Sequence, residues 1–154
     1  MAILQGIKRI SPLDLNKNVR IGVAFPLDDI NMFQGTETIK EQVKTNLINV
    51  LLTVPGERIN LPKYGVGLKK LLFENEINTE LLKEKINFQI SKYVENIRVT
   101  SVDIGASEDE HTIFITIVYR VLLDGSLDSI KLNFIKKWLI IKYQIQIKIK
   151  MLDI

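Results

Sequence analysis

The sequence predicts an α+β protein, a small single domain in which amphipathic helices pack on an antiparallel β meander. Two segments with apolar residues at helical spacing are followed by three segments that alternate apolar and polar residues with a period of two. The chain has 154 residues and is 46% hydrophobic, which is enough to bury one core. We expect the domain to span residues 36–135, between an extended N-terminal arm (1–35) and a C-terminal β extension (136–154).

The N-terminal arm has no clean period. Prolines and glycines interrupt its apolar residues, so we expect extended chain with one short strand around Val19 to Phe25. Its first residues lack a sustained apolar run before a small-residue cleavage site and make a poor secretory signal. No window of about eighteen uninterrupted apolar residues predicts a membrane span.

A first helix is predicted to begin at the sequence TIKE, Thr38 to Glu41, which has the form of a capping box. The helix should end before Pro55, which cannot continue it. One apolar face is predicted, consisting of Ile39, Val43, Leu47, Val50 and Leu51.

The connection after this helix is rich in turn residues. The sequence VPGE fits a type II turn with Pro55 second and Gly56 third, where a positive φ is required. Gly65 and Gly67 allow close backbone approach before a short helix in LKKLLFE. The leucines expected to hold this short helix on the core are Leu68, Leu71 and Leu72.

A second helix is predicted from a cap at Asn78 or Thr79 to about Tyr93. Its apolar side consists of Leu82, Ile86, Ile90 and Tyr93. Three strands follow. IRVTSVDIG and TIFITIVYRVLL should pair as a hairpin around the acidic loop ASEDEH, and SIKLNFI should add a third strand.

The C-terminal extension alternates for ten residues, with isoleucines and Tyr143 on one side and lysines and glutamines on the other. This pattern predicts a strand from about Leu139 to Lys150. A long apolar strand invites association if it is left unpaired, so we expect it to join its own sheet or a partner's. From Lys131 onward six lysines against one aspartate give a charge of +5, so the first 130 residues carry −2 of the total +3.

No pattern in the sequence predicts catalysis, a metal site or a cofactor. The single histidine, His111, lies in the acidic loop without a partner for metal binding, and the absence of cysteine excludes thiolate chemistry. The carboxylates Glu108, Asp109 and Glu110 lack the spacing of a calcium loop, and YGVG lacks the remaining parts of a phosphate-binding motif. A glycosidase pair, for instance Glu57 with Glu74 or Glu74 with Glu95, would need an apolar cleft that the sequence does not indicate.

The connection between the two helices also carries a recognisable signature. Its parts are Gly56-Glu57-Arg58, Pro62-Lys63-Tyr64-Gly65, Leu68 and Leu72-Phe73-Glu74. They resemble the pattern Gly-x-Arg, Pro-x-(Phe/Tyr)-Gly, Leu and Leu-Phe-Glu of the baseplate wedge family of contractile-tailed bacteriophages, whose relatives serve the type VI secretion baseplate. The resemblance covers about Thr38 to Phe134, with helices, hairpin and last strand in family order.

The resemblance implies a structural protein of the virion tail baseplate, made in the host bacterial cytoplasm, and not an enzyme. It implies contacts with other wedge proteins and the tail sheath protein, with the tail tube as a further candidate neighbour, and strands that template the first sheath ring. The family's Glu-Pro-Arg motif is altered here, to Val94-Glu95-Asn96 in register or to Glu95 and Arg98 after an insertion. We expect Arg58 and Glu74 to make polar contacts between elements or subunits, and Tyr64 and Phe73 to anchor the short helix. The full set of expected partner-binding residues is Arg58, Tyr64, Phe73, Glu74, Glu95, Arg98, Ile141, Tyr143 and Ile145.

Two other classes of function are open to the sequence. A cell-wall muramidase is one, because some relatives carry the label of acidic lysozyme. A nucleic-acid-binding module using the lysines of the tail with Tyr143 or Trp138 is the other, although Tyr143 falls on the face opposite the lysines. We expect neither nucleic acid nor membrane among the partners.

Overall fold

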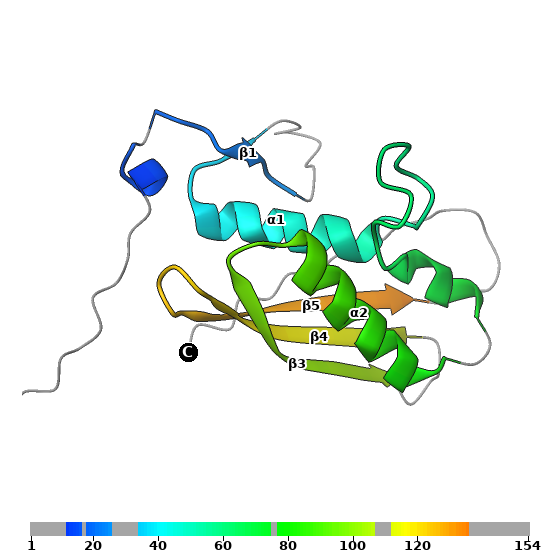
Figure 1. Cartoon of the computed structure of the whole chain (residues 1–154). Coiled ribbons are helices and arrows are strands. Elements are labelled where there is room, and N and C mark those ends of the chain that lie inside the picture. The colour runs from blue at the N-terminus through cyan, green and yellow to red at the C-terminus, as the bar shows by residue number, and fades with distance from the viewer. Residues whose placement is uncertain (1–11, 17, 26–33, 75–76, 107–111, 136–154) are drawn as a thin grey trace, which may run out of the picture.

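The computed structural model describes residues 12–16, 18–25, 34–74, 77–106 and 112–135. Two α-helices, α1 (Ile39–Leu52) and α2 (Thr79–Tyr93), lie on one face of a three-stranded sheet (Figure 1). The strands are β3 (Ile97–Ala106), β4 (Thr112–Val121) and β5 (Leu127–Ile135). Smaller elements are the 3-10 helices η1 (Pro12–Leu15) and η2 (Leu68–Phe73) and the short strands β1 (Gly22–Val23) and β2 (Gly35–Thr36). The predicted α+β class is confirmed.

The main sheet is the predicted antiparallel meander, in the order β3-β4-β5. The register joins Ile97 to Val121 across β3 and β4, and Thr112 to Ile135 across β4 and β5. A bulge between Val99 and Ser101 shifts the register within β3. Strand β4 is central, and every second side chain from Ile113 to Val121 is buried toward the helices, as a period of two requires.

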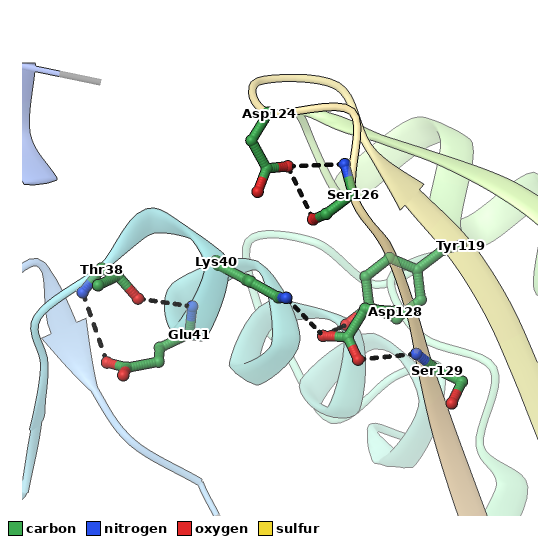
Figure 2. A network of polar contacts seen from close by, with 8 residues as sticks. All are labelled: Thr38, Lys40, Glu41, Tyr119, Asp124, Ser126, Asp128 and Ser129. Carbon is green, nitrogen blue, oxygen red and sulfur yellow. Dashed lines mark hydrogen bonds and ion pairs between the residues drawn. The ribbon is translucent and has the colours of Figure 1, made fainter. Parts of the chain in front are cut away.

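Helix α1 begins at the predicted capping box (Figure 2). The hydroxyl of Thr38 accepts from the N–H of Glu41 at 3.2 Å, and the Glu41 carboxylate accepts from the N–H of Thr38 at 3.4 Å. The N–H of Ile39 donates to Asp14 Oδ1 at 2.8 Å, so η1 also satisfies a free backbone donor at this helix end. These bonds fix the start of α1 and hold a described part of the arm beside it.

A polar network joins α1 to the β4–β5 hairpin (Figure 2). The hydroxyl of Tyr119 donates to Asp128 Oδ2 at 3.2 Å, and Lys40 Nζ lies 4.0 Å from the same oxygen. The other carboxylate oxygen of Asp128 accepts from the N–H of Ser129 at 2.8 Å. Burial, followed by the neighbouring charge of Asp128, strongly raises the pKa of Tyr119, so the phenol stays protonated and can donate.

The core lies between the two helices and the sheet. Leu47, Ile48, Val50 and Leu51 of α1 are fully buried, and Ile86 and Ile90 of α2 pack against the same cluster. The predicted apolar faces of both helices are therefore confirmed, with Ile39 and Tyr93 partly buried at their ends. On the sheet side the core consists of Val102, Ile113, Ile115, Ile117, Tyr119, Val121, Ile130, Leu132 and Phe134.

Two described elements of the N-terminal region, the 3-10 helix η1 and the strand β2, were not predicted from the sequence. The short strand expected around Val19 to Phe25 is β1, and it pairs antiparallel with β2, which was not predicted. A strand of two residues, Gly35 and Thr36, shows no periodicity, so only the pairing itself reveals it. The acidic loop 107–111 with His111, and the predicted strand from Leu139 to Lys150, lie outside the described residues. The division into arm, domain and extension stays a prediction.

Candidate partner-binding surface

The connection between α1 and η2 begins with the predicted type II turn. The N–H of Glu57 donates to the carbonyl of Val54 at 3.1 Å, and Gly56 has a φ of 98°. The Glu57 carboxylate accepts from the N–H of Val54 at 2.9 Å. This glutamate therefore serves the turn, and Arg58 is presented to solvent beside it.

Gly65 lets the loop return against the end of α1. Its φ is 102°, and a Cβ at this position would lie 2.2 Å from the carbonyl oxygen of Thr53. The next residue, Val66, donates its N–H to the carbonyl of Val50 at 2.9 Å. Only a glycine fits such a close approach of two backbone segments.

Gln89 of α2 fixes the same part of the loop. The side chain is only 7% exposed, its Oε1 accepts from the N–H of Gly65 at 2.9 Å, and its Nε2 donates to the carbonyl of Lys63 at 3.0 Å. Both polar atoms of a buried amide are thus satisfied by loop backbone. Gln89 was not predicted from the sequence as a functional residue, although its position between Ile86 and Ile90 on the buried side of α2 indicates burial.

An aromatic cluster connects the signature loop to α2. The guanidinium of Arg58 lies 3.9 Å above the ring centre of Tyr64, and the rings of Tyr64 and Tyr93 meet edge to face at 4.9 Å. Lys92 Nζ lies 5.3 Å from the centre of the Tyr93 ring. Tyr64 is buried, and burial raises the pKa of its phenol although Arg58 opposes the shift. The cluster thus holds two exposed cationic side chains, Arg58 and Lys92, beside the aromatic rings.

The prediction that Phe73 anchors η2 is wrong for the isolated chain, because this side chain is 74% exposed. Leu68 and Leu71 are buried and hold η2 on the core. The reason is the element type: a 3-10 helix has three residues per turn, so Leu68 and Leu71 point to the same side and Phe73 points elsewhere. The contact of Phe73 with a partner stays a prediction.

Helix α2 also carries large apolar side chains that are exposed. Leu81 is 63% exposed and Phe88 60% exposed, and their spacing of seven places both on the outer side of the helix. A hollow between η2 and the start of α2 is lined by apolar residues including Leu71 and Leu81, with Lys70, Glu74 and Lys85 also in its lining. We call this area, from Phe73 across the hollow to Phe88, the η2–α2 surface.

Glu95 lies in the turn from α2 into β3, and Arg98 is the second residue of β3; both are exposed. Asn96 between them has a φ of 63°, and its carbonyl accepts from the N–H of Leu122 at 2.8 Å. Glu95 and Arg98 make no ion pair with each other. The remaining predicted site residues, Ile141, Tyr143 and Ile145, lie outside the described residues.

The described part of the chain contains no cluster of three or more His, Cys, Asp or Glu side chains that could hold a metal ion. Its helices are also too short or too polar to span a bilayer. The fold and this surface together define a small α+β protein with a fixed loop, exposed apolar side chains and exposed cations on its surface.

A family model for baseplate wedge protein gp25 matches residues 37–126, which is more than half of the chain. The chain therefore belongs to the baseplate wedge protein gp25 family, and the signature between Gly56 and Glu74 lies within the match. The predicted resemblance is confirmed, and the family gives the chain a structural role in a phage-tail-like baseplate.

Solved structures that are similar to the chain include the following two. A candidate tail lysozyme from Geobacter sulfurreducens matches with a TM-score of 0.56 and 23% identity, over 66% of this chain and 94% of that one, which shows the fold. A chain of the anti-feeding prophage baseplate matches with a TM-score of 0.45 and 23% identity, over 75% and 85% of the two chains. Among curated proteins no significant match is found.

Proposed function

We propose that this protein packs with other wedge proteins near the tail tube of a contractile tail and templates the sheath by β-strand augmentation. Membership of the baseplate wedge family is the observation that carries the proposal. Two separate areas of the protein are candidates for these contacts. One is the η2–α2 surface with the signature loop, and the other consists of the outer strand edges of the main sheet.

The η2–α2 surface is the area we assign to neighbouring wedge proteins. Phe73, Leu81 and Phe88 are large apolar side chains that are each more than half exposed, so we expect a partner to cover them in the assembly. Arg58 is held against Tyr64 with its charge available, which suits a carboxylate on the partner. Glu74, Glu95 and Arg98 are the further polar positions that we assign to partner contacts.

The sheet edges are the area we assign to the tail sheath protein. Strands β3 and β5 are the two outer strands of the main sheet, and neither pairs with a further strand among the described residues. An incoming strand gains backbone hydrogen bonds at such an edge, and its alternating side chains set the register. In the assembled tail, Ile141, Tyr143 and Ile145 of the extension would supply apolar contacts for the exchange.

The experiment is tail assembly with variants of this chain. A chain lacking residues 139–154 should still fold but should fail to start the sheath, whereas Phe73→Asp with Leu81→Asp should weaken incorporation into the wedge. Gln144→Ala is a control with a single polar change in the extension and should assemble normally. Normal sheathed tails from the truncated chain would contradict the templating proposal.

We also propose that the protein is not a muramidase, consistent with its structural family. The carboxylate of Glu57 is engaged by the backbone of its own turn, which favours a structural role for this residue. The test is clearing of cell walls by the purified protein. Clearing that is lost in both Glu57→Gln and Glu74→Gln would overturn this part of the proposal.

Binding of nucleic acid is a further outcome that we do not expect. Filter binding over a salt series measures it directly, because phosphate contacts weaken steeply as salt rises. Salt-sensitive retention of DNA or RNA by the full chain would count against the assignment of the basic extension to protein partners.

A further inference from the structure

Strand β5 is the last described element of the chain and an outer strand of the main sheet. Strand β5 pairs with β4 on one side, and no described strand pairs with it on the other. Its last residue is Ile135, and 19 residues follow it in the sequence. An unpaired edge strand exposes backbone donors and acceptors that attract another strand.

Asn133 on β5 indicates that something lies against this region. Its side-chain oxygen is buried and has no hydrogen-bond partner among the described residues. The register places Asn133 opposite Phe114, on the sheet face away from the helices, whereas Phe134 faces the core. A buried oxygen without a hydrogen-bond donor is costly, so we expect the donor to come from outside the described residues.

The positions of the apolar residues in β5 and in the extension limit the register in which the two segments can pair. The inward residues of β5 are the even-numbered Ile130, Leu132 and Phe134. The apolar residues of the extension are odd-numbered, from Ile141 to Ile149. In an antiparallel hairpin the numbers of paired residues have a constant sum, so an odd sum places both apolar sets on the core side. A slip by one residue would turn the lysines of the extension toward the core.

The lysine residues indicate how long the loop between β5 and the extension should be. A two-residue loop would use Lys136 and Lys137, which are unsuited to the positive φ of such turns, and would set Lys142 opposite Lys131. A four-residue loop, 136–139, instead pairs Ile135 with Ile140 and sets Lys142 opposite Asn133. The ammonium of Lys142 is then a donor within reach of the side-chain oxygen that lacks one.

We propose that in the free chain residues 140–149 form a fourth strand, antiparallel to β5 and joined to it by a loop of residues 136–139. A short loop gives the tethered strand an effective concentration of about millimolar, so it competes well against a second copy of the chain. The proposal does not rest on the baseplate role. If the proposal holds, strand exchange during assembly would have to replace the existing hairpin of β5 with residues 140–149.

The chain has no cysteine, so engineered disulfides test the pairing cleanly. Lys131→Cys combined with Gln144→Cys, a pair that faces each other in the proposed register, should form an intramolecular bridge in the monomer under mild oxidation. Lys131→Cys with Ile145→Cys is the matched control, because this pair lies on opposite faces of the sheet. Asp103→Cys with Gln144→Cys controls for collisions with the far strand β3.

The outcomes separate clearly. An intramolecular disulfide in the variant with Lys131→Cys and Gln144→Cys, absent from both control variants, supports the proposal. A disulfide-linked dimer shows that the extension pairs with a second copy and overturns the proposal. So does a stronger bridge when Lys131→Cys is combined with Lys142→Cys or Gln146→Cys, because those pairs face each other in other registers. None of these results bears on tail assembly, so failure here is distinguishable from failure of the proposed function.

Hydrogen exchange provides a second measurement that needs no cysteine variant. In the full chain, the β5 amides that point away from β4 should be protected by the fourth strand. Deleting residues 139–154 should raise the exchange rates of these amides at least tenfold and leave β4 unchanged. Equal exchange of β5 in the full and truncated chains would overturn the proposal.

Discussion

At the scale of single residues, the signature loop depends on two kinds of glycine. Gly56 and Gly65 both have a φ near 100°, but a Cβ on Gly56 would meet nothing within 4 Å, whereas a Cβ on Gly65 would collide with the backbone of Thr53. The first glycine is needed for its conformation, and the second for its conformation and its size.

We predict that Gly56→Ala lowers the free energy of unfolding by about 1–2 kcal/mol, the usual cost of a left-handed backbone with a side chain. Gly65→Ala should cost clearly more, about 3 kcal/mol or more, because a backbone segment must also move. Urea unfolding of the two variants measures the difference. Equal losses would show that the approach to Thr53 is not as close as the structure gives it.

Phe73 and Leu71 form a second contrast at this scale. Leu71 is 5% exposed and Phe73 is 74% exposed, although both belong to η2. We predict that Leu71→Ala lowers the free energy of unfolding by about 2–5 kcal/mol. Phe73→Ala should change it by no more than about 0.5 kcal/mol in the isolated chain. Unfolding measured on the purified protein checks both values, and a large loss in Phe73→Ala would restore the anchoring role that the structure contradicts.

At the scale of elements, Gln89 joins α2 to the signature loop. Its amide satisfies two backbone groups, the N–H of Gly65 and the carbonyl of Lys63. We predict that Gln89→Leu lowers the free energy of unfolding by about 2–4 kcal/mol, since each buried group that loses its partner costs about 1–3 kcal/mol.

Asn87→Leu, a similar change at an exposed position of the same helix, is the matched control and should be close to neutral. The change at Gln89 should also broaden the amide signals of residues 63–65 in NMR spectra, because the loop loses its contact with α2. A variant that unfolds at the same urea concentration as the control would show that the clamp contributes nothing.

At the scale of the whole molecule, the network around Asp128 joins the first helix to the last hairpin of the described fold. Burial and the charge of Asp128 raise the pKa of Tyr119. A group whose pKa is higher in the folded state holds its stabilising effect below its unfolded pKa, about 10 for tyrosine, and loses it as the pH rises further.

We therefore predict that stability falls between pH 8 and pH 11, with about 1 kcal/mol of the loss due to Tyr119. Tyr119→Phe should be less stable at pH 8, because the hydrogen bond to Asp128 is gone, but its stability should fall less as the pH rises. Urea unfolding at the two pH values gives both slopes. Parallel slopes would mean that Tyr119 ionises as easily in the folded protein as in the unfolded chain.

The sequence by itself determined the main elements of this protein. The capping box at Thr38, the apolar spacing of both helices and the alternation of the three strands each depend on neighbours a few residues away, so local patterns suffice to predict them. The signature from Gly56 to Glu74 likewise indicated the family, because its parts keep their spacing along the chain.

Only the tertiary structure decided how these parts meet. The clamp of Gln89 on Gly65 spans 24 residues, and the pairing of β1 with β2 depends on contacts without any local period. The exposure of Phe73 was misjudged because hydrophobicity predicts burial only when the geometry of the element turns the side chain inward, and a 3-10 turn places Leu68 and Leu71 there instead. Separation along the chain is the physical reason: a sequence pattern records the preferences of neighbouring residues, whereas these contacts form between segments that only the fold brings together.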